Sequence, residues 1–194
     1  GTNSGNITVQ DGGVGLIANA TQDVTTINNS GNLVLKGGDN ANRTTGIKAS
    51  GTTTTVNMTA GTISLQGQGA IGVEASNKGT VNLDGSAVPN FASDGSGIID
   101  QIAFRIIGDG ATIKTNIAPG TLLDASGERS VLFRIEDGAK QAGSLLMKTS
   151  GTGSRGIWAT GKGSNVLAEA GSDFQILGAQ AQGLYVTGGA TATL

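Results

Sequence analysis

The sequence predicts an all-β protein built as a single-stranded parallel β-helix, a three-faced β-solenoid of about seven coils. Three observations predict this fold. A glycine followed by an apolar, a variable and an apolar residue recurs along the whole chain of 194 residues. Short pieces in each repeat alternate apolar and polar residues, the period of a strand, and Gly, Ser, Thr and Asn separate them. No stretch keeps the i, i+3, i+4, i+7 spacing of an amphipathic helix, which excludes solenoids built from helices.

The glycine motif itself is the first strand-like piece of each repeat. Its seven copies, two of them without the glycine, are residues 15–18, 46–49, 72–75, 103–106, 132–135, 156–159 and 183–186. The six intervals between them average 28 residues. A period of about 20–50 residues indicates a solenoid or a propeller, and this period is too short for the four strands of a propeller blade.

Two further strand-like pieces follow the glycine motif in the repeats. Copies of the second are residues 26–27, 55–56, 80–81, 112–113, 144–145 and 165–166. Copies of the third are clear at residues 33–35, 63–65 and 174–176 and altered at 121–123. Each coil should therefore add one strand to each of three faces, with equivalent residues stacked about 4.8 Å apart on successive coils.

Alternation within the glycine motif separates core positions from surface positions. The first inward position is apolar in every copy: Leu16, Ile47, Val73, Phe104, Phe133, Ile157 and Leu184. The second inward position is Ala or Val except beside the two phenylalanines, where it is Ile106 and Ile135. The core should be wider at those two coils. Because one coil buries little apolar surface, stability should come from contacts between neighbouring coils.

One irregular region interrupts an otherwise single domain. We expect residues 1–194 to form one β-helix domain, and both ends fall inside the repeat pattern, as they would in a segment of a longer array. Residues 84–98, which include Pro89, depart from the third strand position. We predict that they form a loop extruded from the stack.

Composition narrows the possible partners. The net charge is −2 and only 13% of residues are charged, which does not suggest nucleic-acid binding. No apolar run approaches the roughly 20 residues of a spanning helix, so we expect no membrane insertion by this segment. Cysteine is absent, which fits either a cytosolic protein or a bacterial secreted one.

The residue types limit the chemistry. The absence of His and Cys removes His-dependent nucleophilic triads and the usual ligands of a zinc site, so we predict no enzyme activity, no cofactor and no metal. A polysaccharide-cleaving β-helix would need clustered carboxylates. The candidate acids are Asp94, Asp100, Asp109, Glu128, Glu136 and Asp137. We expect them to be solvated in turns.

Three stretches carry a resemblance to a known family: GIKASGTTTTVNMTAGTISLQGQG, GVEASNKGTVNLDGS and GIWATGKGSNVLAEAGSDFQILGAQAQGLYVTGG. They resemble coils of pertactin-like and AIDA-type autotransporter passengers of Gram-negative bacteria. The resemblance covers nearly the whole chain and is weakest across residues 84–116. It implies a right-handed β-helix on the bacterial cell surface, in a passenger attached to or released from the outer membrane. It also accounts for the lack of cysteine, because disulfides hinder passage through an outer-membrane pore.

The outward position of the glycine motif offers a candidate binding surface. Its residues are Ile17, Lys48, Glu74, Arg105, Arg134, Trp158 and Tyr185. Lys48, Glu74 and Arg105 should form a ladder of alternating charge. We predict that Arg105, Arg134, Trp158 and Tyr185 bind a ligand, since aromatic rings with arginine commonly hold a sugar or a peptide.

These observations favour an adhesin whose partner is a host-cell glycan, a matrix protein or a like molecule on another bacterium. Self-association would use the polar ladder of Thr26, Thr55, Thr80 and Thr112. Two alternatives stay open. One is a polysaccharide-processing β-helix enzyme or tailspike-like depolymerase, and the other is a purely structural stalk.

Overall fold

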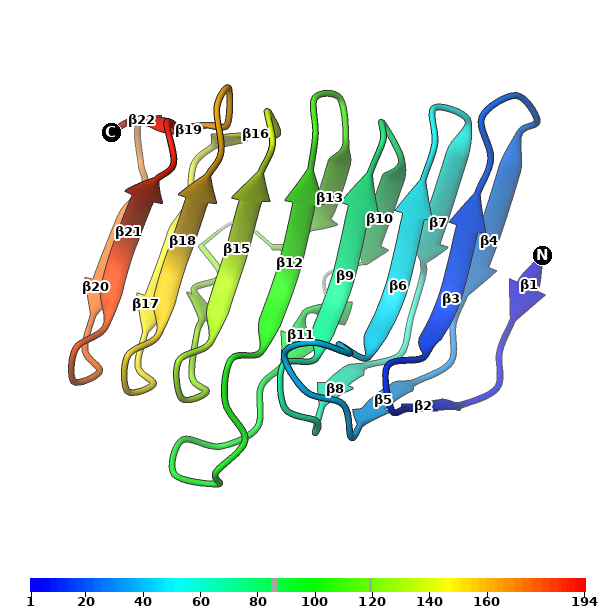
Figure 1. Cartoon of the computed structure of the whole chain (residues 1–194), viewed down its shortest axis with the longest axis horizontal. Coiled ribbons are helices and arrows are strands. Elements are labelled where there is room, and N and C mark those ends of the chain that lie inside the picture. The colour runs from blue at the N-terminus through cyan, green and yellow to red at the C-terminus, as the bar shows by residue number, and fades with distance from the viewer. Residues whose placement is uncertain (85–86, 119) are drawn as a thin grey trace.

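The chain folds as a parallel β-solenoid of about seven turns (Figure 1). The computed structural model describes residues 1–84, 87–118 and 120–194, and 22 strands lie within these ranges. Successive strands pass from face to face in a fixed cycle, so each strand pairs in parallel with the strand three places away. In the described ranges no helix is long and apolar enough to cross a membrane.

The first face is one continuous seven-stranded sheet, which lies toward the viewer in Figure 1. Its strands are β3 (Val14–Asn19), β6 (Thr45–Ser50), β9 (Ile71–Ser76), β12 (Ile102–Ile107), β15 (Val131–Glu136), β18 (Arg155–Thr160) and β21 (Gln182–Thr187). Every copy of the glycine motif lies in this sheet. The register aligns Leu16 with Ile47 and continues copy by copy to Leu184, as predicted.

The second face is divided into two sheets. The first comprises β1 (Thr2–Asn3), β4 (Thr25–Asn29), β7 (Thr54–Met58), β10 (Thr80–Asp84) and β13 (Thr112–Asn116). The second comprises β16 (Lys140–Gly143), β19 (Asn165–Ala168) and β22 (Thr191–Thr193). The prediction that residues 144–145 belong to this face is wrong. Gln141 pairs with Val166, so the polar stretch 140–143 takes the place that an apolar residue marks in the other coils.

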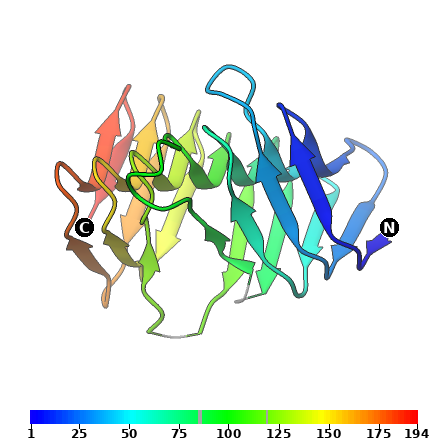
Figure 2. The same cartoon turned by 90° about the horizontal axis from the view of Figure 1, so that it is seen from below.

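The third face is also divided. Its first sheet comprises β2 (Ile7–Gln10), β5 (Leu33–Lys36), β8 (Ile63–Leu65) and β11 (Pro89–Asn90). Its second sheet comprises β14 (Leu123–Asp124), β17 (Leu146–Thr149) and β20 (Asp173–Ile176). Figure 2 shows from below how the strands of successive coils follow one another along the rod.

The region expected to be an extruded loop is partly a strand. Pro89 pairs with Ile63 in β11, and the neighbouring Ala87 is fully buried in the core, so the third strand position is shortened and not lost. Proline is tolerated here because β11 is the edge strand of its sheet. The excursion itself spans residues 91–101 and projects beyond the strand ends in Figure 1. Residues 85 and 86 of the expected loop lie outside the described residues.

One hydrophobic core runs along the rod, from Leu16 to Val166. It is bulkiest at the two coils predicted from sequence, where the rings of Phe104 and Phe133 stack at 4.9 Å between centroids. The second face divides between β13 and β16 and the third between β11 and β14, whereas the first face continues past both breaks through β12 and β15. Coil-to-coil stacking also explains Gly51, whose φ is +113°. A Cβ at this position would lie 1.7 Å from the carbonyl oxygen of Ala20 on the preceding coil.

Candidate functional site

The predicted outward ladder of the first face exists, and its charged members form ion pairs from coil to coil. Lys48 Nζ lies 2.8 Å from Glu74 Oε1, and Arg105 Nη1 lies 3.0 Å from Glu74 Oε2. Arg105 Nη2 also lies 2.7 Å from Glu136 Oε2, and Arg134 pairs with the other oxygen of that carboxylate. The alternating charge ladder is therefore confirmed and extends further than predicted.

Glu136 is not solvated in a turn, as the sequence led us to expect. It is the last residue of β15, on the same side of the strand as Arg134, and its side chain is only 6% exposed. Burial of a carboxylate is costly unless cations and hydrogen bonds compensate it. Arg105 and Arg134 supply this compensation, so Glu136 is part of the outer surface of the sheet.

Beyond Glu136 the ladder becomes aromatic. The rings of Trp158 and Tyr185 meet edge to face with centroids 5.8 Å apart. The guanidinium carbon of Arg134 lies 4.3 Å from the Trp158 ring centroid. That of Arg155 lies 4.8 Å from Trp158 and 4.7 Å from Tyr185. We call Arg134, Arg155, Trp158 and Tyr185 the cationic–aromatic cluster. Two guanidinium groups already occupy the aromatic surface, so the rings hold the arginines in place.

Arg155 was missed as a site residue, although the sequence carries a signal for it. It precedes the glycine motif, and the equivalent residues on other coils form a second outward ladder, mostly apolar: Val14, Thr45, Ile71, Ile102, Val131 and Gln182. Arginine at this position departs from that pattern.

The apolar part of this second ladder is covered although it faces outward. Ile71, Ile102 and Val131 form a cluster separate from the main core, each at most 3% exposed, and Trp158 packs against it. The connection of residues 37–44, between β5 and β6, reaches across the same coils. From it Asn40 donates a hydrogen bond of 2.7 Å to Asp100 Oδ2.

Arg43, another residue that the sequence did not single out, lies in this connection. Its Nη1 donates to the carbonyl oxygens of Gly69 and Asp100, at 2.8 and 3.0 Å. In the described part of the chain it has no carboxylate within ion-pair distance. Burial lowers the pKa of the Arg43 guanidinium, the charges of Arg134 and Arg105 lower it further, and Asp100 and Glu136 oppose the shift. Arginine nevertheless stays charged at neutral pH.

These residues enclose a hollow of about 290 Å³. We call it the arginine hollow. Its lining residues are Asn40, Arg43, Asp100, Ile102, Arg129, Val131, Arg134, Gly153, Arg155 and Trp158. Four arginines thus face one aspartate. That carboxylate already accepts from Asn40 and from two nitrogens of Arg129. Of the four residues predicted to bind ligand, Arg134 and Trp158 line the hollow, Tyr185 contacts Trp158, and Arg105 belongs to the ion-pair ladder beside it.

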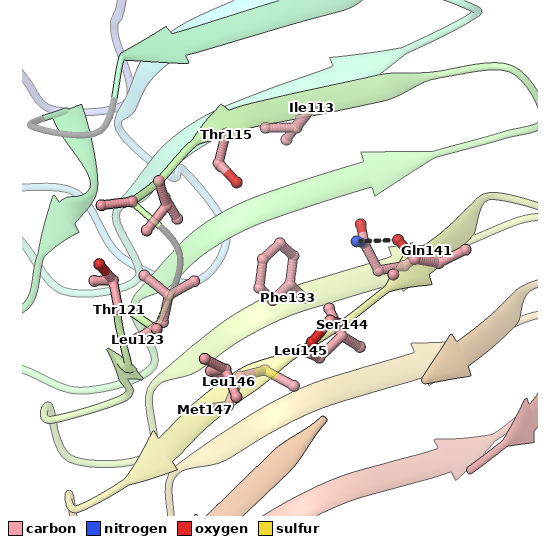
Figure 3. A pocket seen from close by; sticks show the side chains of 15 residues that line it. Ile113, Thr115, Thr121, Leu123, Phe133, Gln141, Ser144, Leu145, Leu146 and Met147 are labelled. Atoms are coloured by element: carbon pink, nitrogen blue, oxygen red, sulfur yellow. Dashed lines mark hydrogen bonds between the residues drawn. The ribbon is translucent and has the colours of Figure 1, made fainter. Parts of the chain in front are cut away.

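A second hollow, of about 370 Å³, lies where the second face divides (Figure 3). Core side chains such as Leu123, Phe133 and Met147 line it, together with Thr115, Thr121, Gln141 and Ser144. It carries no charged group among its described lining residues. Because Gln141 stands where other coils place an apolar side chain, this hollow marks incomplete packing of the core.

Three of the remaining candidate acids contact donors or cations on other coils. Asp94 accepts from Thr152, Asp100 pairs with Arg129, and Asp109 pairs with Lys140. Among the described residues, His, Cys, Asp and Glu form no group of three or more that could hold a metal ion. The contacts of Asp94, Asp100 and Asp109 join different coils and so stabilise the stack, whereas Asp137 is exposed in a turn.

The chain matches no protein-family model, no curated protein and no solved structure with which it was compared.

Proposed function

We propose that this chain is a segment of a bacterial surface adhesin in which a β-solenoid presents the cationic–aromatic cluster to a glycan or matrix protein. The resemblance of its coils to autotransporter passengers supports a place on the bacterial cell surface. The observation that carries the proposal is that the only Trp and the only Tyr of the chain meet on one outer sheet surface, with two arginines packed on them.

The physical argument rests on what each part contributes. A sheet of parallel strands is stiff, so side chains on its surface are held in fixed relative positions without a ligand. A few residues supply most of the binding energy in protein interfaces, and Trp, Tyr and Arg are enriched among them. Trp158 and Tyr185 are half-buried, which leaves part of each side chain available for contact.

Replacement of both Trp158 and Tyr185 by alanine tests the proposal. We expect the double variant to bind its target on a glycan and extracellular-matrix array at least about tenfold more weakly than the wild type. Ile176→Ala with Leu177→Ala is a matched control, because it removes two exposed apolar side chains from a different face. Unchanged binding by the Trp158 and Tyr185 variant would remove the proposal.

A structural stalk is the second candidate, and the ion-pair ladder favours it. Glu74 and Glu136 are buried carboxylates that tie four successive strands of the first face together. A stalk predicts that the chain binds nothing on the array, while loss of Glu74 or Glu136 still lowers its stability.

A further inference from the structure

We infer that the arginine hollow binds an acidic saccharide, with the carboxylate or sulfate of one sugar held between Arg43, Arg134 and Arg155. The inference rests on the proposed adhesive function and specifies its ligand class.

The first step is the excess of positive charge. The whole chain carries a net charge of −2, yet four arginines and one aspartate line this hollow. Asp100 is already bound by Arg129 through Nε at 2.9 Å and Nη2 at 3.0 Å. Arg134 shares the Glu136 carboxylate with Arg105, whereas Arg43 and Arg155 have no carboxylate within ion-pair distance in the described ranges.

The second step is the supply of hydrogen-bond donors. Within the described ranges, Nε and Nη2 of Arg43 and both terminal nitrogens of Arg134 and Arg155 have no acceptor. Arg155 is positioned through Nε, which donates to Gln182 Oε1 at 2.8 Å. The indole N–H of Trp158 is also shielded from solvent without an acceptor there. An anionic group offers the acceptors that these donors lack, and guanidinium binds planar or tetrahedral oxyanions in a bidentate manner.

The third step is preorganisation. Trp158 and Tyr185 hold the guanidinium of Arg155, and Trp158 and Glu136 hold that of Arg134. Two backbone carbonyls on neighbouring coils hold Arg43. Three arginines fixed in this way lose little side-chain entropy on binding.

The fourth step separates a saccharide from other anions. The half-buried indole of Trp158 forms one wall of the hollow, against which the C–H face of a sugar ring can pack. Ile102 and Val131 form an apolar base beneath it and are themselves almost fully covered. The volume of about 290 Å³ is just below the roughly 300–1,000 Å³ of sites for drug-sized ligands. A hollow of this size suits one charged ring of a glycan better than an extended acidic peptide.

Calorimetric titration of the complete chain with matched oligosaccharides tests the inference. The probes are a uronic-acid tetrasaccharide, the same sugar with its carboxylates reduced to alcohols, a sulfated neutral tetrasaccharide and its desulfated parent. We expect at least one acidic probe to bind about tenfold more tightly than its neutral counterpart. The two pairs distinguish carboxylate from sulfate as the recognised group. A hexapeptide of alternating Asp and Gly is included as an acidic ligand of another class.

Variants assign the binding to this hollow. Arg155→Gln and Arg43→Gln should each weaken the acidic probe by about tenfold or more, and Arg155→Lys should recover only part of the loss because lysine cannot bind in a bidentate manner. Lys162→Gln is the matched control, since Lys162 is exposed beyond the opposite end of β18. Thermal unfolding of each variant shows whether it is folded. If a glutamine variant does not fold, Arg155→Lys still tests the role of the guanidinium group.

Three outcomes would overturn the inference: equal affinity for acidic and neutral sugars, equal effects of Arg43→Gln and Lys162→Gln, or preference for the peptide. If the array target is still bound through Trp158 and Tyr185 in any of these cases, the adhesive function stands without the acidic ligand. If the chain binds no target on the array, the proposed adhesive function is rejected. The titrations with soluble sugars still test whether the arginine hollow binds an acidic saccharide.

Discussion

At the scale of single residues, the outer surface of the first face is stabilised by carboxylates that the strand pattern does not reveal as buried. Glu74 and Glu136 are almost fully buried, and each forms ion pairs with two basic residues. A buried pair is destabilised most when one partner is removed, because the other keeps its desolvated charge. Glu136 should show this effect most clearly, because its removal would leave both Arg105 and Arg134 without this carboxylate partner.

Glu136→Gln keeps the size of the side chain and removes its charge. We expect the free energy of unfolding to fall by about 1.5–3 kcal/mol, the worth of hydrogen bonds to a charged group. Chemical denaturation followed by circular dichroism measures it. Asp137→Asn is the control, since the neighbouring carboxylate is exposed and should change stability by less than about 0.5 kcal/mol. Equal effects of the two substitutions would contradict a structural role for the buried carboxylate.

At the scale of elements, two long connections shape the candidate site. Residues 37–44 bring Arg43 and Asn40 over the first face, and residues 91–101 bring Asp100 to the same place. The second connection is tied to a later coil through Asp94 Oδ2, which accepts from the backbone N–H and the hydroxyl of Thr152, both at 2.9 Å. The loops, more than the strands, therefore decide where the hollow closes.

The Asp94 tether should depend on pH. The hydrogen bonds from Thr152 hold the pKa of the Asp94 carboxyl below its ordinary value of 3.8. A lowered pKa means that the tether is fully present above pH 3.8 and is lost as the pH falls through the folded-state pKa below that value. We expect the Thr152 amide resonance to titrate with a midpoint below 3.8 in an NMR experiment.

Two variants separate this tether from general acid effects. Asp94→Ala should abolish the titration of the Thr152 amide. Asp109→Ala should leave it intact, since Asp109 pairs with Lys140 and not with the tether. A Thr152 amide that titrates in the Asp94 variant as in the wild type would show that the hydrogen bond does not exist in solution.

At the scale of the whole molecule, the rod is continuous on one face and divided on two. Among the described residues, only the first face joins the coils before residue 116 to those after residue 123 by strand pairing, through β12 and β15. Solenoid stability is approximately a sum over repeats and their interfaces, so a weak interface can separate two halves. The stacked Phe104 and Phe133 lie at that interface.

Phe104→Ala should destabilise the interface by about 3–5 kcal/mol, because it leaves a cavity in the core. Trp158 is the only tryptophan and lies in the C-terminal half, so its fluorescence reports that half while circular dichroism reports both. We expect the two denaturation curves to separate in the variant. Val73→Ala, two strands away from β15 in the first face, should lower stability without shifting the fluorescence transition. Coincident curves for Phe104→Ala would mean that the halves unfold as one unit.

The sequence by itself determined the repeat, the plan of three strands to a coil, the inward ladder from Leu16 to Leu184 and the outward ladder from Ile17 to Tyr185. These features follow from short-range periodicity, and stacking with a fixed register turns each recurrence into a spatial neighbour. The wider core at Phe104 and Phe133 was also readable, because side-chain volume alone predicts it.

Only the tertiary structure decided how the long connections fold back. Arg43 and Asp100 are 57 residues apart and meet because two loops cross the same sheet, a contact that periodicity does not encode. The burial of Glu136, the division of two faces and the strand at Pro89 were missed for a related reason, because packing and not local pattern decides them. The candidate site therefore combines a surface ladder predicted from sequence with an arginine hollow that only the folded loops assemble.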